Sequence, residues 1–274
     1  NYVNIRLLSV KKILVLGDVG VDKYTMGTVH RISPEAPIPI VEVRDTSRKL
    51  GLASNVADNV KTLGGMPMLI GLIGKDFGAR EFESLLRDRK ISTKFIVRSA
   101  GRRTTLKERV VAENQQVVRI DYESRNELSA AEERFVQRYI ERAMADADAV
   151  IIEDYAKGLL KNNICESTIE QAVRKKIPVL VDPNVHGNLS LYFGCSIITP
   201  NILETEALTG IKVTDYPSLL RAGQKLLAEV NAKTAIITRG KDGMAVFSQN
   251  AREPLLIPTF AREVFDVSGA GDTV

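Results

Sequence analysis

The chain has 274 residues, of which 44% are hydrophobic and 26% are charged. This mixture is typical of a globular protein, and it excludes a chain whose main state is disorder. Lysine and arginine number 38 and aspartate and glutamate 34, so the net charge of +4 is too small to indicate a nucleic-acid binder, although it suits small anionic ligands.

The start of the chain, residues 1–12, does not show the order of basic, apolar and small residues that marks a secretory signal. The apolar runs that follow are far shorter than the ~20 residues that a membrane span needs. We therefore expect no membrane contact and a cytoplasmic protein. We expect its two cysteines, Cys165 and Cys195, to be buried and reduced, because neither lies in a Cys-x-x-Cys pair.

Short runs rich in Val and Ile recur between stretches with helical periodicity. Such runs are typical of parallel strands that are buried on both faces. They lie at residues 13–16, 149–152, 179–181, 197–199 and 235–238. Their alternation with helices predicts an α/β fold of three layers, with a central, mostly parallel sheet flanked by helices.

Four segments have the apolar spacing of amphipathic helices. The first covers residues 53–63 and ends at a Gly-Gly pair. The second begins at Ser129, where a serine followed three residues later by glutamate forms a capping box, and we expect Phe135 to face the core. The third covers residues 162–176, with Val173 facing inward, and the fourth opens at Pro217.

Two stretches break this rhythm. Residues 24–49 are rich in proline and extended, and residues 94–121 alternate around a polar turn. We interpret both as strands of a small sheet that covers one edge of the main domain as a lid. An ordinary edge hairpin is the alternative that propensity leaves open. Because such strands have open edges, we also expect a homodimer that pairs through them.

The last segment, residues 266–274 (DVSGAGDTV), is the most informative. Its small residues Gly269, Ala270 and Gly271 let backbone amides close around an anion, and a helix beginning just beyond them would point its positive end at the same place. The carboxylate of Asp272 lies beside this cradle, where it can take a proton from an alcohol during phosphoryl transfer. Alone, so short a pattern also describes an ordinary tight turn.

Other phosphate-binding patterns are excluded by their spacing. The chain has no Gly-x-x-x-x-Gly-Lys-Ser/Thr loop, and residues 17–22 (GDVGVD) lack the third glycine of a dinucleotide fingerprint. Residues 76–78 (DFG) match a protein-kinase tripeptide, but the motifs that accompany it in protein kinases are absent. We interpret this tripeptide as a coincidence or a plain turn.

Three motifs accompany the C-terminal one, at residues 51–55 (GLASN), 199–204 (TPNILE) and 238–243 (TRGKDG). Together they resemble the ribokinase-like carbohydrate kinases over nearly the whole chain, from residue 13 to residue 274. The resemblance implies one kinase domain over residues 1–274, with a small β-sheet lid on the central sheet. It also implies ATP as the phosphoryl donor and Mg²⁺ as the metal.

Three further runs narrow the resemblance, at residues 31–39 (RISPEAPIP), 113–121 (ENQQVVRID) and 153–158 (EDYAKG). They look like the heptose 7-phosphate kinases of lipopolysaccharide-precursor synthesis, and the first is the most specific. This implies phosphorylation of the anomeric hydroxyl of D-glycero-D-manno-heptose 7-phosphate. Two alternatives stay open: a kinase for another sugar or a nucleoside, and a nucleotide- or sugar-phosphate-binding protein without turnover.

The resemblance also implies roles for single residues. Asp272 would be the general base, and Gly269, Ala270 and Gly271 the anion hole for the γ-phosphate. The residues expected to contact the sugar are Asp18, Asp22, Gly51, Asn55 and Asp154. Of the first two, one is expected to serve only as a turn or cap residue.

On the nucleotide side, the resemblance places Thr238 and Gly240 against ATP. Asn201 and Glu204 lie three residues apart on the first turn of a helix, so they share a face and would hold Mg²⁺ through water. Helix capping is the alternative for this pair, because asparagine caps helices well.

The phosphate of the substrate needs a cationic partner. Among the basic residues near the motifs we favour Lys107, Arg109 and Lys157, and we expect Arg102, Arg103 and Arg119 to be solvated. We expect His30 and His186 to be packing or surface residues, since neither has a partner at catalytic spacing.

The chain departs from the family in two places. Asn184 stands where the family usually has lysine, so a positive charge near the phosphates is missing. The family pattern also continues beyond Asp272, so we expect the C-terminal part of the family domain, and any nucleotidyltransferase domain after it, to be absent from this chain.

Overall fold

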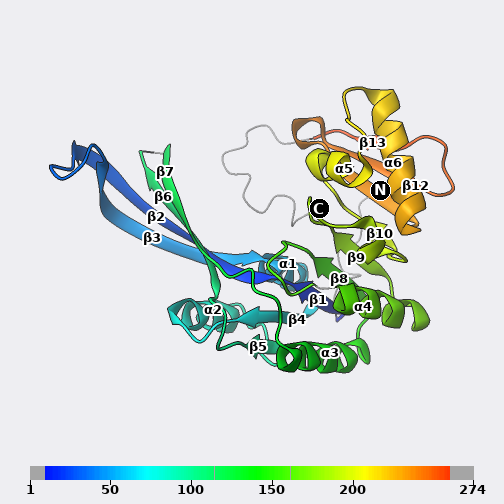
Figure 1. The fold of residues 1–274 in the computed structure, drawn as a ribbon, viewed down its shortest axis with the longest axis horizontal. Coiled ribbons are helices and arrows are strands. Elements are labelled where there is room, and N and C mark those ends of the chain that lie inside the picture. Colours follow the sequence, from blue (N-terminus) through cyan, green and yellow to red (C-terminus); the bar gives the residue numbers. More distant parts are fainter. Residues whose placement is uncertain (1–9, 114, 161, 260–274) are drawn as a thin grey trace.

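The computed structural model describes residues 10–113, 115–160 and 162–259. Two sheets organise this part of the chain (Figure 1). The larger sheet has nine strands in the order β13-β12-β11-β10-β9-β8-β1-β4-β5, and the smaller sheet has four in the order β3-β2-β6-β7.

In the larger sheet, the strands from β5 to β11 pair in parallel, and β12 and β13 add an antiparallel edge. The predicted, mostly parallel central sheet is therefore confirmed. The strands of this sheet are β1 (Lys12–Gly17), β4 (Met66–Ile73), β5 (Ile96–Arg98), β8 (Ala149–Glu153), β9 (Val179–Asp182), β10 (Ile197–Ile198), β11 (Thr234–Thr238), β12 (Met244–Ser248) and β13 (Leu255–Ile257).

Helices cover both faces of this sheet. They are α1 (Ala53–Thr62), α2 (Phe77–Asp88), α3 (Ala130–Met144), α4 (Asn162–Arg174), α5 (Ile202–Thr209) and α6 (Tyr216–Val230). The side chains of β1 point alternately to the two faces of the sheet, and a separate core cluster lies on each face. Ile13 and Val15 pack with α1 and α2, whereas Leu14 and Leu16 belong to the cluster of α3, α4 and α6. This arrangement confirms the three-layer fold.

The predicted helices form close to the expected positions, but two side chains point elsewhere. Ser129 caps α3 in the predicted capping box, and Pro217 lies in the first turn of α6. Phe135 and Val173, however, are 48% and 53% exposed. Both lie on the flank of the buried stripe, so the apolar faces of α3 and α4 are narrower than their sequences indicated.

Helix α2 replaces the turn expected at residues 76–78. The side chain of Asp76 accepts the N–H of Ala79 at 2.9 Å, so this aspartate is the N-cap of α2. Ala79, Phe82 and Leu86 are buried on one side of the helix. The interpretation as a plain turn was wrong, because the aspartate begins an amphipathic helix, while the alternative that the match to a protein-kinase tripeptide is a coincidence is not contradicted.

The small sheet consists of β2 (Val19–Ile32), β3 (Pro39–Leu52), β6 (Thr105–Ala112) and β7 (Gln115–Tyr122). β2 and β3 form a long antiparallel hairpin, and β6 runs parallel to β2. The sheet extends away from the larger sheet (Figure 1). Residues 94–121 were expected to supply strands of the small sheet. The first strand in this stretch, β5, pairs instead with β4 in the larger sheet.

Cys165 and Cys195 are buried and free, as expected. Burial raises the pKa of the Cys195 thiol to about 12, so this group stays protonated and unreactive at neutral pH. In the described part of the chain, no helix is both long and apolar enough to cross a membrane.

Candidate functional site

The candidate sugar residues gather where the chain passes between the two sheets. Asp18 connects β1 to β2, and Asp22 follows in β2. Lys107 stands opposite Asp22 on the neighbouring strand β6, and Arg109 lies two residues further along β6. Lys157 comes from the loop after β8. We call these five residues the crossing cluster.

Asp18 is the most buried member of the crossing cluster, with 5% of its surface exposed. Its Oδ2 accepts the backbone N–H of Lys157 at 2.9 Å. Burial raises the pKa of this carboxyl to about 6; the backbone hydrogen bond from Lys157 opposes the shift, and the charge of Asp154 adds to it. The carboxyl therefore changes its protonation state just below neutral pH.

Asp22 lies against the backbone of Gly51. A Cβ atom at position 51 would be 2.5 Å from Oδ2 of Asp22, so the carboxylate occupies the space that any larger residue would need. The same carboxylate accepts from Nη1 of Arg109 at 2.5 Å, and the guanidinium of Arg109 lies 5.4 Å from the centre of the Tyr24 ring. Asp22 and Arg109 are thus fixed on one face of the small sheet.

The two lysines of the crossing cluster differ in their partners. The ammonium of Lys157 pairs with Glu123 at 2.5 Å, whereas no described residue gives the ammonium of Lys107 a hydrogen bond or an ion pair. Burial lowers the pKa of Lys107, the charge of Lys157 lowers it further, and Asp22 opposes both. Lys107 is a half-buried cation beside a second cation, which favours an anionic ligand at this place.

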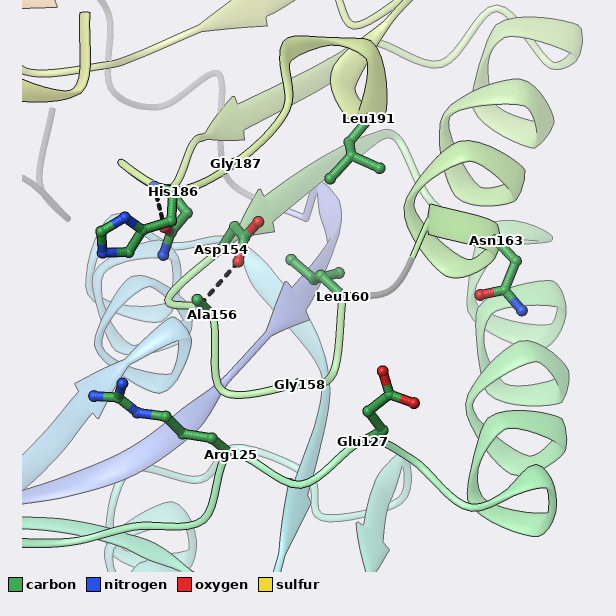
Figure 2. A pocket seen from close by; sticks show the side chains of 11 residues that line it. Arg125, Glu127, Asp154, Ala156, Gly158, Leu160, Asn163, His186, Gly187 and Leu191 are labelled. Atoms are coloured by element: carbon green, nitrogen blue, oxygen red, sulfur yellow. Dashed lines mark hydrogen bonds between the residues drawn. The ribbon is translucent and has the colours of Figure 1, made fainter. Parts of the chain in front are cut away.

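A cavity of about 610 Å³ opens beside Asp154, at the carboxyl ends of β8 and β9 (Figure 2). Asp154 accepts the N–H of Ala156 at 2.9 Å and the hydroxyl of Tyr192 at 2.6 Å. Asn184 also lines the cavity, where the family pattern led us to expect lysine. Arg125 lines it as well and was missed in the sequence, since it precedes α3 outside every motif.

The candidate nucleotide residues lie at the carboxyl ends of β10 and β11. The backbones of Asn201 and Thr238 bridge there, and the N–H of Thr238 donates to the carbonyl of Pro200 at 3.0 Å. Gly240 follows with a φ of 58°, a left-handed conformation that suits glycine. We call Asn201, Glu204, Thr238 and Gly240 the β10–β11 edge.

Asn201 and Glu204 form a reciprocal cap at the start of α5. Oδ1 of Asn201 accepts the N–H of Glu204 at 2.9 Å, and Oε2 of Glu204 accepts the N–H of Asn201 at 2.8 Å. The capping alternative thus describes their contacts, and burial raises the pKa of Glu204. The described residues contain no group of three His, Cys, Asp or Glu that could hold a metal. Mg²⁺ at this edge would need water or phosphate oxygens as further ligands.

The remaining predicted residues are placed as follows. Asn55 lies in the first turn of α1, directly after the Gly51 segment, and has interactions of its own. His30 and His186 are exposed at the surface. Gly269, Ala270, Gly271 and Asp272 lie outside the described residues.

Comparison with known families gives a match over nearly the whole chain. The model of the pfkB family carbohydrate kinases matches residues 12–274. The bifunctional protein HldE of Wolinella succinogenes is 40% identical over 262 residues, which is 96% of this chain and 54% of that protein. HldE of Pelobacter propionicus is 43% identical over 261 residues, 95% of this chain and 53% of that protein. The chain therefore spans about half the length of these relatives.

Solved structures share the fold. Ribokinase of Arabidopsis thaliana, complexed with ribose and ATP, superposes with a TM-score of 0.71 at 18% identity, covering 97% of this chain and 83% of that one. Phosphofructokinase-2 of Escherichia coli, in complex with substrates and products, gives 0.74 at 20% identity, covering 96% and 83%. The predicted ribokinase-like fold is confirmed.

Proposed function

The chain belongs to the pfkB family of carbohydrate kinases, and on this premise we propose that it phosphorylates D-glycero-D-manno-heptose 7-phosphate at the anomeric hydroxyl, with ATP as donor. The product would be the 1,7-bisphosphate, a precursor in ADP-heptose and lipopolysaccharide-core synthesis. The relatives named HldE support this choice of sugar over other acceptors.

In the reaction we propose, the anomeric oxygen attacks the γ-phosphorus of ATP, and the bond to the bridging oxygen of ADP breaks. The proton of the hydroxyl passes to the carboxylate of Asp272, and the amides of Gly269, Ala270 and Gly271 stabilise the charge on the transferring group. Positioning matters most here, since the proton becomes acidic only as transfer proceeds. Asn201 and Glu204 would hold Mg²⁺ through water, where it neutralises phosphate charge.

The preference for a phosphorylated acceptor rests on one observation, the half-buried ammonium of Lys107. Arg109 and Lys157 already form ion pairs, with Asp22 and Glu123, while Lys107 forms none among the described residues and only feels the charges of Asp22 and Asp121 on the neighbouring strands. A half-buried ammonium without a partner is stabilised by a ligand phosphate. Asp18 and Asp22, which belong to the same crossing cluster, would accept hydrogen bonds from the sugar hydroxyls.

A coupled ADP-release assay tests this function. The acceptors are the heptose 7-phosphate, fructose 6-phosphate, ribose and adenosine, and we expect kcat/KM to be highest for the first. Lys107→Met should raise KM for the heptose phosphate by about tenfold to a hundredfold, the worth of a charged hydrogen bond, and leave KM for ribose unchanged. A preference for ribose, fructose 6-phosphate or adenosine would contradict the proposal.

We also propose a homodimer that pairs through the small sheet. β3 and β7 are its open edges, and exposed edge strands tend to pair with another chain. Apolar side chains on these strands are exposed, among them Val43, Val117, Val118 and Ile120. Light scattering at micromolar concentration should give twice the monomer mass, and a monomer would contradict the proposal.

A further inference from the structure

One guanidinium lies where the small sheet joins the rest of the chain. Arg102 belongs to the segment between β5 and β6, which leads into the small sheet. It donates to the backbone carbonyl oxygens of Ser124, Asn126 and Lys157, at 3.2 Å in the case of Ser124. Ser124 and Asn126 lie between β7 and α3. The Arg102 side chain therefore links the segment that enters the small sheet at β6 to the exit segment that leaves it after β7.

The third acceptor, the carbonyl of Lys157, belongs to the loop after β8, and this loop also binds Asp18. Lys157 donates its N–H to Asp18, and its ammonium pairs with Glu123 of the exit segment. Asp18 occupies the crossing from β1 to β2, and its carbonyl accepts the N–H of Ala53 at 3.0 Å, at the crossing from β3 to α1. Within the described residues, the four segments that connect the small sheet to the rest of the fold are therefore all linked through Arg102, Lys157 and Asp18.

Gly158 shows how closely this loop approaches Arg102. Its φ is +93°, and a Cβ atom there would lie 2.6 Å from the carbonyl oxygen of Asn126 and 3.3 Å from Nη1 of Arg102. Both the backbone conformation and the space exclude a larger side chain. The loop is thus packed directly onto the guanidinium.

We propose that Arg102 is a positioning residue, which holds the Lys157 loop against the crossings and so fixes the carboxylate of Asp18 for the acceptor. This inference rests on the proposed function. It gives Arg102 a role other than the solvated charge expected from the sequence. The planar guanidinium suits the role because its several N–H groups point toward separate carbonyls, which one ammonium nitrogen cannot reach together.

Arg102 also acts on Asp18 through its charge. Burial and the charge of Asp154 raise the pKa of Asp18, whereas the backbone groups of Lys157 and Leu159 and the charge of Arg102 lower it. Removal of the guanidinium should therefore raise this pKa further. A residue that only stabilised the fold would not change the titration of Asp18.

The test compares Arg102→Lys and Arg102→Ala with the wild type, using the heptose 7-phosphate and ATP. We expect KM for the sugar phosphate to rise by about tenfold, with KM for ATP nearly unchanged. We also expect the acid limb of the kcat/KM profile to move to higher pH in Arg102→Ala. Arg103→Ala is the matched control, since Arg103 is exposed and only its backbone N–H, which the variant keeps, bonds to Ser124.

A second measurement does not depend on turnover. Hydrogen exchange followed by mass spectrometry should show lost protection at the Lys157 amide in Arg102→Lys, with α6 unchanged. If KM, the acid limb and this protection all stay at wild-type values, or if activity falls only with the folded fraction, the proposal is overturned. If the wild type phosphorylates no acceptor, the proposed function fails, and retained or lost protection at Lys157 then decides the positioning by itself.

Discussion

The crossing cluster and the β10–β11 edge are built from different kinds of group. In the crossing cluster, charged side chains face one another: Asp22 pairs with Arg109, and Lys157 pairs with Glu123. At the β10–β11 edge, Asn201 and Glu204 bind the backbone of a helix end, and Thr238 is placed by its own backbone. Arg109 and Lys157 therefore already have ion-pair partners, and Lys107 is the cation of the crossing cluster that has none among the described residues, whereas a ligand at the edge meets groups fixed by secondary structure.

The largest predicted effect is a pH-dependent change in stability that comes from Asp18 in the crossing cluster. Its pKa lies near 6 in the folded chain, against 3.8 as the ordinary value. Between these pH values the native state keeps a proton that the unfolded chain has lost, so the free energy of unfolding falls as pH rises. At roughly 1.4 kcal/mol per pKa unit, the loss is about 3 kcal/mol.

Asp18→Asn removes this titration. Denaturant unfolding at several pH values between 4 and 7 should show that the variant gains stability relative to the wild type as the pH rises. If the free energy of unfolding depended on pH in the same way in both proteins, burial would not raise the pKa of Asp18. The contrast between the two regions would then weaken.

A smaller effect is expected from Gly51→Ala. The new methyl group would meet Oδ2 of Asp22 at 2.5 Å, so the carboxylate must move and its pair with Arg109 must change. We expect KM for the sugar phosphate to rise by about tenfold, because the acceptor contacts shift while the fold adapts. Gly101→Ala is the control, since a Cβ there meets nothing within 4 Å. Equal KM values for both variants would contradict the placement of Asp22 at the acceptor.

The smallest effect should appear at the β10–β11 edge. Asn201→Ala removes the N-cap of α5 and should cost about 1 kcal/mol of stability. Ser129→Ala removes the matching cap of α3 and should cost a similar amount. Only Asn201→Ala is expected to raise the Mg²⁺ concentration needed for half-maximal rate, and identical Mg²⁺ dependence in the two variants would leave Asn201 as a cap alone.

How far the sequence predicts the fold depends on how local the signal is. The Ser129 capping box and the Val- and Ile-rich strands depend on neighbours within one element, and both were found. Helix α2 has the same kind of signal, since Asp76 precedes a stripe of Ala79, Phe82 and Leu86, but an Asp followed by a glycine two residues later is also typical of a turn, so the pattern is ambiguous by itself.

The candidate site depends on contacts between distant segments, and here the sequence is less informative. Lys107 and Arg109 lie two residues apart on β6, so their shared face can be predicted from the strand period. Which of them pairs with Asp22 cannot be predicted, because Asp22 comes from β2, a separate segment of the chain. The bonds of Arg102 and Lys157 join segments 55 residues apart, and those of Lys157 and Asp18 join segments 139 apart.

The length of β2 gives the crossings an additional importance. The strand has 14 residues and starts directly after Asp18, and at about 3.3 Å per residue it reaches roughly 45 Å from that base. If the strand turned as a rigid body about its Asp18 end, a rotation of one degree would displace its other end by roughly 0.8 Å over this length. A rotation of about four degrees near Asp18 would therefore displace the far end of the hairpin by about 3 Å.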